Sequence, residues 1–118
     1  MNKKNLLFIF QSAPYDTPYA QEGLDTLLAA AVFEQNVSVL FVDEGIFQLL
    51  SEQQPQGRKN HGKMLQALSM YDVENCFYHK PSAVKRQITN ESFSLKATAL
   101  NNLETHALLA SADHTLTF

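Results

Sequence analysis

The sequence predicts an α/β domain, a three-layer α/β/α sandwich around a mainly parallel sheet of about five strands with a flavodoxin-like appearance. Two observations predict this class. Short apolar runs alternate along the chain with longer segments whose apolar residues recur every three or four positions. The runs are nearly continuous, as in strands that are covered on both faces of a parallel sheet. With 118 residues, 45% of them hydrophobic, we expect one domain spanning residues 1–118.

The first half of the chain contains two predicted strands and the helix between them. Residues 6–10 (LLFIF) and 37–42 (VSVLFV) are the apolar runs. Residues 21–35 carry apolar side chains at the spacing of one helix face, namely Leu24, Leu27, Leu28, Ala31 and Val32. A short helical turn is expected over 45–50, and the polar residues 51–60 predict a surface loop.

The same signals continue through the second half. Pro81 is suited to the first turn of a helix, because its missing N–H would be unpaired there in any residue. Residues 114–118 alternate between polar and apolar, which is typical of an edge strand. The other predicted elements are a helix over 63–71, a strand over 73–78, a strand over 93–97 and a helix over 102–111. The pattern does not give the strand order.

Composition excludes several functional classes. The formal net charge is −3, and the basic residues form no extended stripe, so we expect no direct binding of nucleic acid. No apolar segment approaches the roughly 20 residues that cross a bilayer, and no secretion signal is recognisable. The single cysteine, Cys76, excludes an internal disulfide and fits a reducing compartment. We therefore expect a cytoplasmic protein without membrane contact.

Cofactor and metal sites are not expected either. The segment after the first predicted strand, residues 11–18, contains no glycine, so the phosphate-binding fingerprints are absent. Ser12 and Thr17 leave a flavodoxin-like phosphate loop as an alternative, but the two prolines there remove N–H donors. The histidines are scattered without metal-ligand spacing, at His61, His79, His106 and His114.

Two further candidates for chemistry have simpler interpretations. Asp43 and Glu44 follow the second strand at the carboxyl end, where ligands often bind, but Asp43 is favoured as the cap of the helical turn near Gly45. Cys76 lies inside a predicted strand, where a buried cysteine acts as a small hydrophobe. The alternative is that Cys76 carries a persulfide, which requires an exposed thiolate.

Three blocks of sequence resemble the TusC-like (DsrF-like) subunits of the TusBCD and DsrEFH sulfur-relay family. They are residues 12–29, 43–50 and 68–76, and their order and spacing match over the N-terminal two-thirds of the chain. The resemblance implies an α/β/α fold. It also implies a hetero-oligomer with TusB-like and TusD-like subunits, as a dimer of heterotrimers. That assembly passes persulfide sulfur from TusA toward TusE for 2-thiolation of the tRNA wobble uridine.

In this family the relay cysteine belongs to the TusD-like subunit, at the end of a central strand before a short basic helix. In this chain the resemblance places His79 at that position, with Lys85 and Arg86 keeping the basic character and Gln87 replacing a glycine. The chain is therefore expected to be a non-catalytic subunit rather than an enzyme. A free-standing flavodoxin-like binder of small ligands remains an alternative. Candidate interface residues, each of which also suits a core, are Phe47, Leu49, Leu50, Met64, Met70 and Tyr71.

Overall fold

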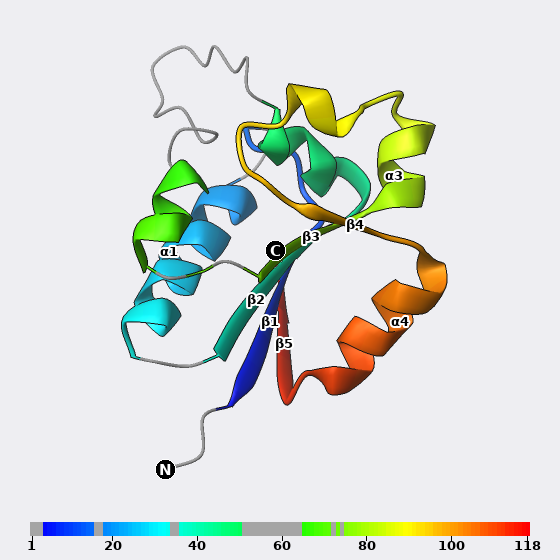
Figure 1. Ribbon diagram of the computed structural model, residues 1–118. Helices are drawn as coiled ribbons and strands as arrows, with labels where there is room; N and C mark the ends of the chain where they lie inside the picture. The colour runs from blue at the N-terminus through cyan, green and yellow to red at the C-terminus, as the bar shows by residue number, and fades with distance from the viewer. Residues whose placement is uncertain (1–3, 16–17, 34–35, 51–64, 72, 74) are drawn as a thin grey trace.

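The computed structural model describes residues 4–15, 18–33, 36–50, 65–71, 73 and 75–118 (Figure 1). Its centre is a sheet of five parallel strands in the order β4-β3-β2-β1-β5. The strands are β1 (Asn5–Phe10), β2 (Asn36–Phe41), β3 (Asn75–His79), β4 (Thr98–Leu100) and β5 (His114–Thr117). Figure 1 shows α1 and α4 on opposite sides of this sheet. The predicted three-layer α/β class is confirmed, and the final segment is an edge strand as expected.

The connections between the strands are helical. The α-helices are α1 (Tyr19–Val32), α3 (Lys80–Lys85) and α4 (Asn102–Ser111), and the short 3-10 helices are η1 (Asp43–Leu49), η2 (Gln66–Tyr71) and η3 (Asn90–Ser92). The predicted bounds of α4 are confirmed. The Asn101 side chain accepts a hydrogen bond from the backbone N–H of Glu104, and the Glu104 carboxylate accepts one from the backbone N–H of Asn101. This capping box defines the start of α4. Within the described ranges, no helix has the length and apolar character needed to cross a membrane.

Alternation along the strands divides the core between the two faces. Phe8 and Phe10 of β1 point to the α1 side, where most of the buried residues cluster, and Leu7 points to the α4 side. On the α1 side Phe10 stacks on Phe41, with ring centroids 5.5 Å apart. Phe118 stacks on Phe8 at 6.2 Å. These aromatic contacts join β1, β2 and the residue after β5 into one apolar layer.

The α4 side has a smaller core. Only Leu7, Leu40 and Leu100 form its buried cluster among the described residues. None of the α4 residues is fully buried, and Leu103 is 80% exposed. One helix therefore covers this face only partly.

Residues 93–97 do not form the predicted fourth strand. The pairing with β3 instead begins at Thr98. Phe93 makes an isolated antiparallel bridge to Leu50 and packs its ring edge-on against Tyr78, with centroids 4.9 Å apart. The alternating apolar residues do pack on the core, but from a loop. Periodicity alone cannot distinguish such a segment from a paired strand.

The predicted helix over 63–71 is only partly described. Its last residues form the 3-10 helix η2. Residues 51–64, which include the predicted surface loop and Met64, lie outside the described residues.

Candidate functional site at the carboxyl edge of the sheet

The carboxyl ends of three neighbouring strands bring polar residues together. Asp43 is the second residue after β2, His79 ends β3, and Asn102 is the second residue after β4. Because these strands are parallel and adjacent, the three positions meet at one edge of the sheet, the edge at which α/β folds usually bind ligands.

His79 is held between two helices. Its Nδ1 lies 2.7 Å from Oγ of Ser82 on α3, and its Nε2 lies 2.6 Å from Oδ1 of Asn102 on α4. Oγ of Ser82 also accepts a hydrogen bond from the backbone N–H of Asp43, at 3.0 Å. One serine and one histidine therefore connect the ends of β2 and β3 to the starts of α3 and α4.

The donors and acceptors fix the tautomer of a neutral His79. Oδ1 of Asn102 only accepts hydrogen bonds, so Nε2 of His79 carries the ring proton and donates the hydrogen bond. Nδ1 then accepts a hydrogen bond from the hydroxyl of Ser82. The oxygen of that hydroxyl accepts a hydrogen bond from the backbone N–H of Asp43. Both ring nitrogens are occupied within the chain, so His79 offers neither of them to a substrate without breaking a hydrogen bond.

The capping interpretation of Asp43 was wrong. Its side chain makes no capping hydrogen bond, and the residue before η1 is Val42. Asp43 instead takes a left-handed backbone conformation with φ of 50°. Aspartate tolerates this conformation better than most residues, and the turn aims the backbone N–H of Asp43 at Ser82.

Ser82 is only 5% exposed. Removing its hydroxyl tests the hydrogen bonds that join Asp43, Ser82 and His79. Ser82→Ala leaves the Asp43 N–H and His79 Nδ1 without their partner, and we expect the free energy of unfolding to fall by about 1–3 kcal/mol in urea titrations. The matched control is Ser111→Ala, an exposed serine that bonds only within its own helix, for which we expect a change below about 0.5 kcal/mol. Equal effects of the two substitutions would show that the network contributes nothing.

Cys76 lies on the other face of β3. It is 3% exposed and belongs to the core on the α1 side, with its thiol 3.9 Å from the carbonyl oxygen of Val73. Burial raises the pKa of the Cys76 thiol from 9.0 to about 11, because an apolar environment disfavours the thiolate. Cys76 and His79 are three residues apart on a strand and so point to opposite faces.

Gln48 is a buried polar residue that our sequence reasoning missed. It is fully buried on η1 and donates a hydrogen bond from Nε2 to the carbonyl oxygen of Ser12, at 2.8 Å. The loop after β1, the location of the phosphate-loop alternative, is thus tied to η1, while Thr17 lies outside the described residues. The available signal was one glutamine inside the otherwise apolar run of residues 45–50.

The candidate interface residues have different environments. Leu49 is fully buried in the core, so it is no surface residue of this chain and that assignment is corrected. Phe47 and Leu50 are half-buried. Met70 is 82% exposed and Tyr71 is 43% exposed, and their role at an interface remains a prediction.

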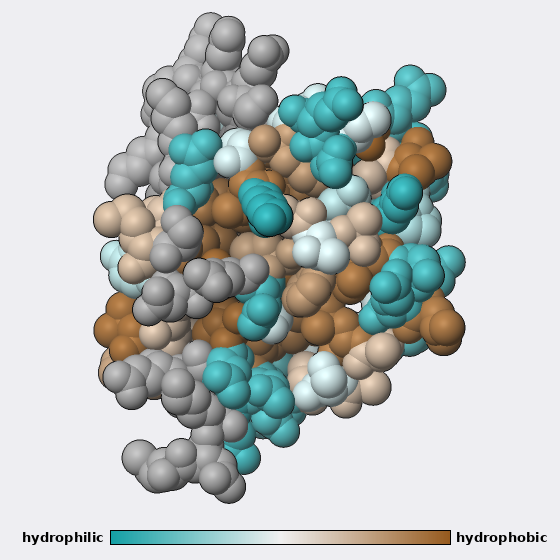
Figure 2. All heavy atoms as spheres, in the orientation of Figure 1, coloured by the Kyte–Doolittle hydropathy of each residue, from teal (hydrophilic) through white to brown (hydrophobic). Residues whose placement is uncertain are grey.

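Val32, the last residue of α1, and Phe33, which follows it, are also exposed apolar residues. Val32 is 61% exposed and Phe33 is 75% exposed, and α1 packs against η2. We call Val32, Phe33, Met70 and Tyr71 the α1–η2 patch. Figure 2 shows hydrophobic side chains at the left margin of the molecule, over the end of α1.

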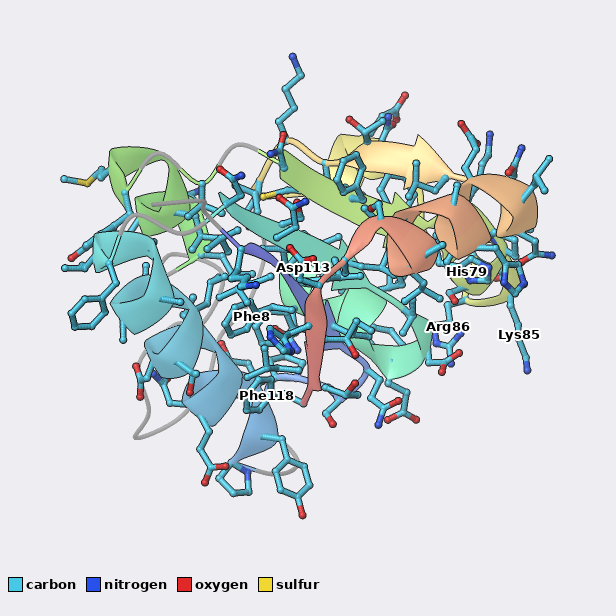
Figure 3. All side chains as sticks on the ribbon, turned by 90° about the horizontal axis from the view of Figure 1, so that it is seen from below. Phe8, His79, Lys85, Arg86, Asp113 and Phe118 are labelled. Carbon is cyan, nitrogen blue, oxygen red and sulfur yellow. The ribbon has the colours of Figure 1, made fainter. Side chains whose placement is uncertain are left out.

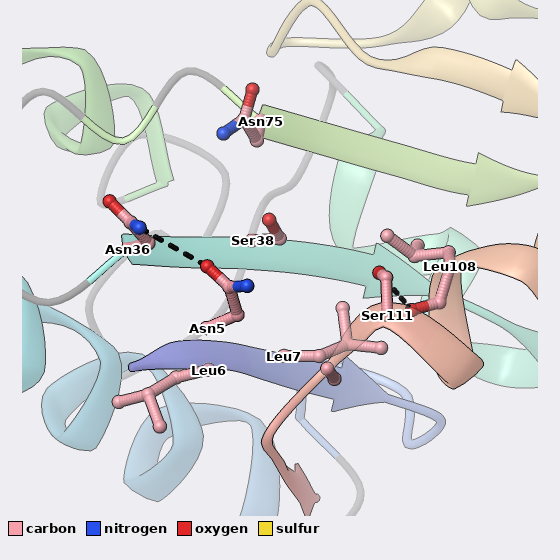
Figure 4. A pocket seen from close by; sticks show the side chains of 9 residues that line it. Asn5, Leu6, Leu7, Asn36, Ser38, Asn75, Leu108 and Ser111 are labelled. Atoms are coloured by element: carbon pink, nitrogen blue, oxygen red, sulfur yellow. Dashed lines mark hydrogen bonds between the residues drawn. The ribbon is translucent and has the colours of Figure 1, made fainter. Parts of the chain in front are cut away.

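A groove without catalytic side chains lies at the amino ends of the strands. It has a volume of about 300 Å³ and lies where β1, β2 and β3 begin, under the end of α4 (Figure 4). Its polar side chains are uncharged, and two of them bond to each other, since Asn36 donates to Asn5 at 3.1 Å. Such a lining supplies no acid, base or nucleophile. Over the described ranges, no three His, Cys, Asp or Glu residues gather as a metal site would require.

The fold and the carboxyl edge define a small parallel α/β domain whose one cysteine is in the core and whose edge histidine is fully hydrogen-bonded. The chain belongs to the DsrE/DsrF-like family, whose family model matches residues 4–118.

Similar proteins agree with this membership. A TusC homolog from Vibrio parahaemolyticus is 32% identical, with 96% of this chain and 98% of that protein covered. Protein TusC from Shigella flexneri serotype 5b is 34% identical, with 98% and 99% covered. The crystal structure of the ychN protein from E. coli matches all of both chains with a TM-score of 0.85 at 22% identity, which supports the fold.

Proposed function

We propose that this chain is a non-catalytic subunit of a TusBCD-type sulfur-relay complex in the cytoplasm. It packs against TusB-like and TusD-like partners in a dimer of heterotrimers. The complex passes persulfide sulfur from TusA toward TusE for 2-thiolation of the tRNA wobble uridine. In this proposal the relay cysteine is on the TusD-like subunit.

The burial of Cys76 is the observation that carries the proposal. A persulfide carrier needs a thiolate that a donor and an acceptor can both reach. The one cysteine of this chain is 3% exposed, with its pKa raised to about 11. At the edge of the sheet, where the resemblance places the relay residue, His79 has both ring nitrogens occupied. Both features favour a structural role over the alternative in which Cys76 carries sulfur.

The α1–η2 patch supports a subunit role. Aromatic residues and methionine are enriched where proteins associate, and Phe33 and Met70 are 75% and 82% exposed. Because α1 packs against η2, exposed apolar side chains on both elements favour a surface that a partner covers.

Co-expression with the TusB-like and TusD-like proteins of the same genome, followed by native mass spectrometry, tests the proposal. We expect one defined complex that contains all three chains. A folded chain that stays monomeric beside its co-expressed partners would contradict the subunit role.

The double substitution Phe33→Asp/Met70→Asp tests the α1–η2 patch in the same experiment. Two carboxylates at the centre of an apolar interface are expected to reduce the assembled fraction by about tenfold or more, since central interface residues often contribute 2 kcal/mol each. Leu103→Asp is the matched control, because Leu103 is 80% exposed but lies on α4 across the sheet. Normal assembly of the double variant would exclude the patch as an interface.

A further inference from the structure

The basic residues of this chain are concentrated at α3. Lys80, Lys85 and Arg86 account for three of its nine Lys and Arg residues, and no Asp or Glu occurs between residues 75 and 90. The chain as a whole carries a net charge of −3. This segment is therefore a local positive region on a mildly acidic protein, and such a region attracts negatively charged surfaces.

These charges are available at the surface. Lys80 and Lys85 are exposed, and no ion pair joins either of them to another described residue. Val84 lies between them in sequence and is 63% exposed. We call Lys80, Val84, Lys85 and Arg86 the α3 face. Figure 3 shows Lys85 and Arg86 beside His79 at one side of the molecule, with Lys85 pointing outward.

Nearby acidic residues offset this face only in part, because two carboxylates on η1 stand against three cations of the α3 face. Asp43 and Glu44 lie on η1, which packs against α3. Both are exposed, and the structure forms no ion pair between them and the α3 face. The positive charges therefore remain free to meet an external partner.

The hydrogen bonds of the carboxyl edge hold the α3 face in place. Ser82, in the middle of α3, is bonded to Asp43 and to His79, and His79 is bonded to Asn102. Arg86 donates from its guanidinium to the carbonyl oxygen of Ser82, at 3.1 Å. A surface that is fixed before binding loses less conformational entropy when a partner arrives.

We propose that the α3 face is a docking surface for an acidic protein surface on a partner subunit of the relay complex, with Val84 as an apolar contact among the cations. This inference rests on the proposed function, because it assumes that the chain works within such a complex. It assigns to the segment around His79 a role in recognition in place of a role in sulfur chemistry. The occupied ring nitrogens of His79 then serve to hold α3, the helix that carries the cations.

The test measures the dissociation constant between this chain and its co-expressed TusB-like and TusD-like partners at two salt concentrations. The variant is Lys80→Glu/Lys85→Glu. At about 0.05 M salt we expect it to weaken binding by about tenfold or more, because attraction becomes like-charge repulsion. At about 0.5 M salt the difference from the wild-type chain should shrink, because salt screens exposed charges.

Two controls separate charge from other effects. Lys96→Glu makes the same kind of charge reversal at a single exposed lysine in the loop before β4, and it should bind like the wild-type chain. Lys80→Arg/Lys85→Arg keeps the charge and should also bind normally. Thermal unfolding of each variant establishes that it is folded.

The outcomes distinguish this inference from the proposed function. Wild-type assembly together with normal binding by Lys80→Glu/Lys85→Glu would overturn the docking face alone. An equal loss in Lys96→Glu would also overturn it, because net charge would then explain the effect. A wild-type chain that forms no complex would overturn the proposed function, and this inference with it.

Discussion

Cys76 in the folded chain is expected to react with iodoacetamide at neutral pH at least about a hundredfold more slowly than an ordinary cysteine. Burial raises its pKa from 9.0 to about 11. At neutral pH the fraction of thiolate falls about tenfold for each unit by which the pKa rises. The thiolate is the species that reacts, and the low exposure of the side chain, 3%, adds a barrier to access. Mass spectrometry of the labelled chain over time measures the rate.

The pH dependence of this reaction has a defined direction. A raised pKa means that the thiol remains protonated through pH 9 and reaches half ionisation at about 11. The labelling rate should therefore keep rising about tenfold per unit between pH 7 and 9 without levelling off. The same chain unfolded in urea is the control, because there Cys76 is solvated. Labelling of the folded chain as fast as the unfolded chain would contradict a buried thiol and revive the persulfide-carrier alternative.

Gly45→Ala is expected to lower the free energy of unfolding by about 3 kcal/mol or more. A Cβ at Gly45 would overlap the carbonyl oxygen of Phe10 and lie 2.6 Å from its carbonyl carbon. That carbonyl accepts a hydrogen bond from the N–H of Val42, at 3.0 Å, so it cannot move aside without breaking the link between β1 and the end of β2. Overpacking of this kind costs about 1–3 kcal/mol even where side chains can adjust, and here the obstacle is backbone.

Gly23→Ala is the comparison for this prediction, measured by urea unfolding. A Cβ there would meet ring atoms of Phe10 and Phe118, and side chains can shift where a backbone carbonyl cannot. We expect a smaller loss than for Gly45→Ala. A Gly45→Ala chain within about 0.5 kcal/mol of the wild type would show that η1 can move away from β1. The substitution also matters for the site, because η1 begins with Asp43, which bonds to Ser82.

Local sequence signals predicted most of the fold. The helix α4 was placed with its observed bounds, and the structure adds the capping box of Asn101 and Glu104 that fixes its start. The first three strands were found within one or two residues of their ends, since continuous apolar runs are typical of buried parallel strands. The segment 93–97 was misassigned because an apolar alternation shows which side chains face the core and does not show whether the backbone is paired.

The candidate site was harder to predict. His79 was singled out through the family resemblance, but its partners Ser82 and Asn102 were not. Asn102 lies 23 positions from His79 in the sequence, and the two meet because β3 and β4 are neighbours in the sheet. The pairing of neighbours depends on strand order, and no local pattern in the chain encodes that order.

The sequence by itself determined the class of this protein: a parallel α/β layer structure, one cysteine, and no glycine-rich phosphate loop after the first strand. These properties depend on composition and on short-range periodicity, which the chain displays directly. Only the tertiary structure decided that Cys76 points into the core, that Asp43 turns its N–H toward Ser82, and that His79 is bonded at both nitrogens. Burial and hydrogen bonding between distant residues arise when strands take their order and register, so they exist only in the folded chain.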